Sequence, residues 1–77
     1  MINKKLIDSI AKELKHHLSR LKDDEQSYRH IMKLYYTHVE SIGNRTIEQA
    51  VKDNFSCGSC RISIRKYWER ILEQYGY

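Results

Sequence analysis

The 77-residue chain contains no proline and only three glycines. Proline breaks helices and glycine weakens them, so a chain this poor in both favours long helices. No apolar run approaches the roughly 18 to 20 residues that a membrane-spanning helix needs. The first residues also lack the apolar core and small-residue cleavage site of a secretory signal. These absences predict a soluble, cytoplasmic protein with no membrane contact.

Cysteine is scarce, occurring only at Cys57 and Cys60 in the motif Cys-Gly-Ser-Cys. In a chain without an export signal we expect reduced thiols rather than a structural disulfide. The spacing also suits half of a zinc site, but a structural zinc needs four ligands, and no second Cys-x-x-Cys follows. Histidines folded back from elsewhere, or a second chain sharing the ion, would have to complete it. The histidines are His16, His17, His30 and His38.

A redox pair is another interpretation of this motif, because the N-terminus of a helix stabilises a thiolate. That chemistry normally belongs to a strand-turn-helix unit, and the sequence has no strand alternation. The favoured interpretation is structural, with Cys60 on a buried helix face and Cys57 in a turn that Gly58 permits. We therefore expect no metal and no cofactor.

Positive charge is concentrated at the two ends of the chain. With 14 Lys and Arg against 10 Asp and Glu, the net charge is +4. Residues 1–22 carry six basic and two acidic side chains, residues 23–56 four and six, and residues 57–77 four and two.

A domain of this length buries only about 60% of its surface, so self-association or docking onto a partner would help to stabilise it.

Apolar residues repeat at three- and four-residue steps along most of the chain, as in amphipathic helices. This pattern predicts a first helix over residues 3–21, with Asn3 as N-cap. After the polar segment 22–27, a second helix is predicted over residues 28–42, ended by Gly43 as a left-handed C-cap.

The rest of the chain predicts two more helices. Thr46 and Gln49 have the spacing of a capping box at the start of a short helix that ends near Phe55. A Ser-Cys-Gly-Ser turn follows, in which Ser56 or Ser59 can cap a longer last helix. The predicted fold is all-α, a compact bundle of about four helices, three long and one short, forming a single domain over residues 1–77.

The last two predicted helices have the layout of a helix-turn-helix, with a short turn containing glycine before a longer basic helix. Ile64 and Trp68 lie on the inner face of that last helix, and a basic face points outward. Arginine forks on such a face suit guanine edges and phosphates of double-stranded DNA. The alternative interpretation is that these basic residues are simply a solvent-exposed helix face, partly neutralised by neighbouring glutamates. The candidate contact residues are Arg61, Ile62, Arg65, Lys66 and Arg70.

Aromatic residues are more numerous than four short helices need inside, with six tyrosines and one tryptophan. Tyrosine, tryptophan and arginine anchor protein interfaces. Neighbours on a helix face different sides, so Tyr35 and Tyr36 cannot both face one core, and we take Tyr36 as a candidate contact. We therefore expect a protein partner, or a second copy in a homo-oligomer, and rank this at least equal to DNA binding.

Catalysis has little support in the sequence. The histidines and carboxylates show no recognisable spacing with a nucleophile, and four short helices enclose little pocket volume. We therefore expect that the protein is not an enzyme and has no small-molecule substrate.

The C-terminal layout, "KLYY" followed by a spacer and "CGSCRISIRKYW", resembles that of small, mostly uncharacterised bacteriophage proteins. These proteins end in a Cys-x-Ser-Cys turn that leads into a last basic helix. The resemblance covers residues 33–77 and brings no catalytic or metal-binding role to the cysteines. It implies a phage origin, where short basic helical proteins serve as transcriptional regulators, virion or packaging components, or inhibitors that bind a host protein during host takeover.

Overall fold

The computed structural model describes residues 2–22 and 24–77, which form four helices and no strand. The helices are α1 (Lys4–Leu18), α2 (Glu25–His38), α3 (Ile47–Phe55) and α4 (Gly58–Gln74). For these residues the prediction of an all-α fold with three long helices and one short helix is confirmed.

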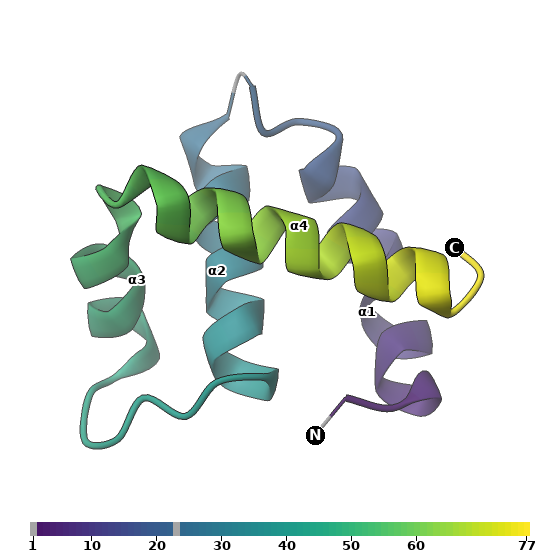
Figure 1. Ribbon diagram of the computed structural model, residues 1–77, viewed down its shortest axis with the longest axis horizontal. Coiled ribbons are helices and arrows are strands. Elements are labelled where there is room, and N and C mark those ends of the chain that lie inside the picture. The colour runs from purple at the N-terminus through teal and green to yellow at the C-terminus, as the bar shows by residue number, and fades with distance from the viewer. Residues whose placement is uncertain (1, 23) are drawn as a thin grey trace.

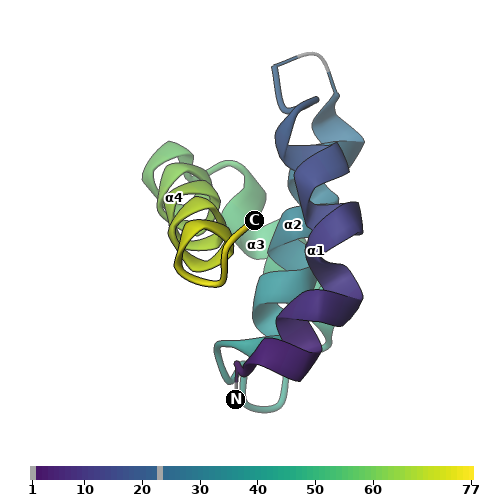
Figure 2. The same ribbon diagram turned by 90° about the vertical axis from the view of Figure 1, so that its right-hand side faces the viewer.

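The helices form two layers. α1, α2 and α3 run alternately up and down in one layer, and α4 lies across one face of it (Figure 1). The turned view shows α4 on one side of the layer (Figure 2). α3 and α4 pack against each other and are joined through only Ser56 and Cys57. The connection is shorter than the turn predicted over residues 56–59, because Gly58 is already the first residue of α4. The outer side of α4 therefore faces solvent along the helix.

Trp68 is the centre of the core between the two layers. Its side chain is fully buried, and its indole Nε1–H donates to the main-chain carbonyl of Ile31 at 3.0 Å. The rings of Tyr35 and Tyr67 meet it edge to face. The buried hydrophobic residues, drawn from all four described helices and the turn after α1, are Ile7, Ile10, Ala11, Leu14, Leu21, Ile31, Met32, Tyr36, Ala50, Val51, Ile64, Trp68 and Leu72. Burial of these side chains holds α4 on the helical layer.

The ends of the first two helices differ from the sequence prediction. α1 stops at Leu18, and Leu21 is buried within the following turn rather than on the helix. α2 begins at Glu25, inside the segment that we expected to be a loop. The cause is Asp24, whose carboxylate accepts from the Gln26 amide at 3.0 Å and caps the helix. Asp23 lies outside the described residues.

The C-terminus of α2 also falls earlier than predicted. The helix ends at His38, and Gly43, with φ of 67°, lies further along in the connection to α3. Gly43 provides the left-handed conformation that was expected, but in the loop and not at the helix end.

The predicted N-caps fare better. Asn3 Oδ1 accepts from the Leu6 amide at 2.8 Å, and Thr46 Oγ1 accepts from the Gln49 amide at 3.1 Å, as the sequence indicated. At α4 neither serine is the cap. Cys57 takes that position, with its Sγ 3.3 Å from the Cys60 amide. Ser56 is the C-cap of α3.

Candidate functional site

The two cysteines form a disulfide across the first turn of α4. Their Cα atoms are 5.2 Å apart, because Cys57 is the N-cap and Cys60 lies three residues further, where the helix brings the side chains together. The expectation of reduced thiols is therefore wrong for this structure. Joined sulfurs are no longer thiolate ligands, so this pair does not hold a metal in this state. The disulfide locks the turn from which the outer face of α4 starts.

Arg61 has a structural role that the sequence did not reveal. Its Nη1 donates to the Phe55 carbonyl at 2.6 Å, and its guanidinium lies over the Phe55 and Tyr28 rings at 5.1 and 5.6 Å. The contact satisfies a carbonyl at the end of α3, where no intrahelical donor is available. Arg61 was predicted to contact DNA or a partner, but this hydrogen bond and the two ring contacts direct its side chain back onto α2 and α3.

Arg65 is only partly available. Its side chain is 38% exposed, and Glu69 Oε1 lies 3.9 Å from Nε, close enough for attraction but too far for a hydrogen bond. Among the described residues, this buried Nε has no hydrogen-bond partner. Arg65 thus lies at the edge of the exposed face and is drawn toward Glu69.

Ile62, Lys66 and Arg70 remain exposed, as predicted. Their four-residue spacing places them in one line along the outer side of α4, which we call the outer stripe. Ile62 is 44% exposed, an uncommon position for a large hydrophobic side chain in this structure. Glu69 and Glu73 are exposed on the same helix. The outer stripe therefore has an apolar head followed by two cations.

Tyr36 is not on the surface. It is only 6% exposed, and burial raises the pKa of its phenol. α2 packs against α1, α3 and α4 at once, so residues on several sides of this helix are covered. That position explains why two adjacent tyrosines are both packed, with Tyr35 half-buried against Tyr67 at a ring distance of 5.3 Å. The prediction of Tyr36 as an exposed contact is wrong.

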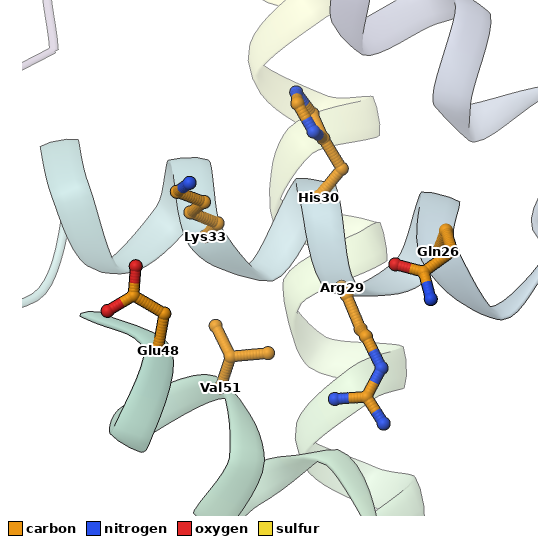
Figure 3. Close-up of a pocket in the computed structure, with 6 residues that line it drawn as sticks. All are labelled: Gln26, Arg29, His30, Lys33, Glu48 and Val51. Carbon is orange, nitrogen blue, oxygen red and sulfur yellow. The ribbon is translucent and has the colours of Figure 1, made fainter. Parts of the chain in front are cut away.

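A shallow groove of about 280 Å³ lies between α2 and α3. Lys33 and Glu48 lie at one end of it, and Gln26 and Arg29 at the other (Figure 3). Arg29 is also held by Glu25 at 3.4 Å and by the Phe55 ring at 4.1 Å. The lining carries charges of both signs and is open to solvent. It therefore suits the binding of a polar side chain from a partner better than catalysis of a reaction that must exclude water.

A cluster of Glu13, His17 and His30 joins α1 to α2, with one candidate ligand atom from each residue within 4.8 Å of the others. His17 Nδ1 lies 3.0 Å from the hydroxyl of Ser27, which is itself 1% exposed and 3.1 Å from Asp24 Oδ2. Burial, followed by the neighbouring His30 and His16, lowers the pKa of His17. The sequence suggested histidines only as additions to the cysteine pair, and Glu13 was missed. Its one local signal was the four-residue step to His17.

None of the helices in residues 2–22 and 24–77 combines the length and the hydropathy of a membrane-spanning segment. The chain matches no protein-family model, no curated protein and no solved structure.

Proposed function

We propose that this chain is a small phage-type protein-interaction module that binds through the outer stripe of α4. The observation that carries the proposal is Ile62, 44% exposed at the head of a line that continues with Lys66 and Arg70. An apolar anchor beside cations suits a partner surface with an apolar hollow bordered by carboxylates. Such a module would assemble with itself or inhibit a host protein.

The contacts within the protein favour a protein partner over nucleic acid. Arg61 is bound to the Phe55 carbonyl, and Arg65 lies near Glu69. Of the four basic candidates, Lys66 and Arg70 are therefore the two that remain exposed. Each neutralised phosphate adds to the affinity for DNA, so a short line with nearby glutamates is a weak electrostatic match for a duplex.

A second copy of the chain is the partner that its own charges favour. Glu40, Glu48 and Asp53 are exposed in the acidic middle of the sequence and are opposite in charge to the outer stripe. Head-to-tail contact would bring these opposite charges together. Assembly would also cover apolar surface of a small domain with a limited core.

Sedimentation velocity over a range of protein concentrations tests self-assembly. We expect association that weakens with added salt and is reduced by Ile62→Ser or by Lys66→Glu with Arg70→Glu. Lys12→Glu, at an exposed site on α1, is the matched control and should leave association unchanged. A monomer at all concentrations would exclude self-assembly and leave a different protein as the partner.

A host partner is tested by placing a photo-cross-linking amino acid at Ser63, beside the outer stripe, and at Lys12 as control. Both positions are exposed. A single defined adduct from Ser63, lost in Ile62→Ser and missing from Lys12, would support the proposal. Equal adducts from both positions, or none from Ser63 together with a monomeric chain, would contradict it.

DNA binding is the second candidate, and the placement of α4 favours it. α4 follows α3 after two residues and lies outermost across the layer, where its exposed side can approach a groove (Figure 1). Fluorescence anisotropy with a labelled duplex at low salt tests this. Affinity that falls with salt and with Lys66→Ala plus Arg70→Ala would support it, and no binding at low salt would exclude it.

A further inference from the structure

The Glu13, His17 and His30 side chains are positioned as a group of metal ligands. Glu13 and His17 are four residues apart on α1, so both side chains lie on the same side of that helix. His30 reaches them from α2, with its ring centroid 4.2 Å from that of His17 and its Nε2 in contact with the Glu13 carboxylate. The cluster thus draws on two helices that are separated in sequence by a turn.

Two part-buried hydrogen bonds behind His17 orient its ring. The Ser27 hydroxyl has one proton, which it donates to Asp24 Oδ2 at 3.1 Å, so it accepts the proton on His17 Nδ1 at 3.0 Å. With the proton on Nδ1, the other ring nitrogen, Nε2, keeps a lone pair that can bind a metal ion. Histidines that bind metals are typically held in this way, by a hydrogen bond from the nitrogen that does not ligate.

We propose that Glu13, His17 and His30 form a binding site for zinc or a similar late first-row divalent metal ion. Two imidazole nitrogens and one carboxylate oxygen are ligands that zinc accepts in four-coordinate sites. A tetrahedral ion needs donor atoms about 3.3 Å apart, and donors already within 4.8 Å reach that spacing by side-chain rotation.

The site has three protein ligands and an exposed side. The side chains of Glu13 and His30 are 44% and 35% exposed, so a fourth position faces solvent and is accessible to water or to a ligand from another molecule. A bound ion would join α1 to α2 and stabilise the folded chain, because the two helices lie apart once the protein unfolds. This inference concerns a face of the α1–α2 pair and does not depend on the outer stripe of α4.

The test is to titrate zinc into untagged protein whose disulfide is intact and to measure binding by calorimetry. Absorption spectra of the Co²⁺-loaded protein then identify the coordination. We expect one zinc per chain, a higher thermal midpoint with zinc, and cobalt bands of a four-coordinate nitrogen and oxygen site. His17→Ala, His30→Ala and Glu13→Gln should each weaken binding by at least about tenfold, and Ser27→Ala by about tenfold through loss of ring orientation.

His38→Ala is the matched control, because His38 is a half-buried histidine on α2 outside the cluster, and its variant should bind zinc normally. Glu13 is exposed, so Glu13→Gln tests the site without disturbing the core. No zinc binding at micromolar concentrations would overturn the proposal. Binding unchanged in His17→Ala and His30→Ala, or abolished by Cys57→Ser, would also overturn it.

Discussion

Arg61 and Arg70 have the same side chain on the same helix but different surroundings. Arg61 donates to the end of α3 and stacks over two aromatic rings, whereas Arg70 is exposed on the outer stripe. A helical wheel separates inner from outer residues, but it does not show which neighbouring helix a long side chain reaches. Ile62, Lys66 and Arg70 were therefore predictable as exposed residues, and the role of Arg61 was not.

Arg61→Ala should lower the free energy of unfolding by about 1–2 kcal/mol, because it removes a hydrogen bond to a helix-end carbonyl and the ring contacts. Arg70→Ala should change it by less than about 0.5 kcal/mol, as for an exposed site. Urea denaturation measures both. Equal effects of the two variants would contradict the structural role of Arg61.

The Asp24 carboxylate predicts a pH dependence. Its hydrogen bond from the Ser27 hydroxyl, then that from the Gln26 amide, lowers its pKa below the ordinary value of 3.8. Since the folded pKa is the lower one, the ionised group stabilises the fold above the unfolded pKa, and this contribution disappears as pH falls through the folded value. The stability difference between wild type and Asp24→Asn should therefore shrink below about pH 4. Urea titrations in metal-free buffer at several pH values measure it, and a constant difference would contradict the ionic contribution.

For the helices, features set by contacts within a few residues could be predicted from the sequence, and features set by contacts between helices could not. Asn3 and Thr46 cap their helices through contacts within three residues, so their sequence spacing was sufficient. The end of α2 was predicted wrongly because a glycine that permits a left-handed conformation does not indicate how many loop residues separate it from the helix. The Glu13, His17 and His30 cluster depends on α1 lying beside α2, and Tyr36 is buried because three helices surround α2. No short window of sequence contains that information.

The disulfide at the start of α4 gives a prediction at this scale. Reduction should lower the free energy of unfolding by about 2 kcal/mol, the loop-closure value for a ring of this size. Cys57→Ser with Cys60→Ser is the control, because reductant should not alter its stability. Urea denaturation with and without reductant measures the difference.

Alkylation checks the bond directly. Unfolded protein without reductant should gain no mass from iodoacetamide, and reduced protein should gain two adducts, one for each joined cysteine. Modification before reduction would show free thiols, as we had expected from the sequence alone.

For the whole molecule, Trp68 is the largest of the buried α4 side chains that join the two layers. Trp68→Phe should lower the free energy of unfolding by about 2 kcal/mol, because it loses the hydrogen bond to Ile31 and leaves a void in the core. Urea denaturation followed by circular dichroism measures the loss. Coincident unfolding by circular dichroism and by near-ultraviolet tyrosine signals would indicate that the two layers still unfold together. A change below about 0.5 kcal/mol would contradict the central role of this residue.

The position of α4 across the other helices also affects the order in which the protein can fold during synthesis. α1, α2 and α3 leave the ribosome first, yet the indole that completes their shared core belongs to α4, and Tyr77 beyond it contacts Asp8 in α1. The early helices therefore keep apolar side chains open to water until the last helix has been made. Nascent chains of this protein should be at their most vulnerable to proteases and most attractive to chaperones in that interval.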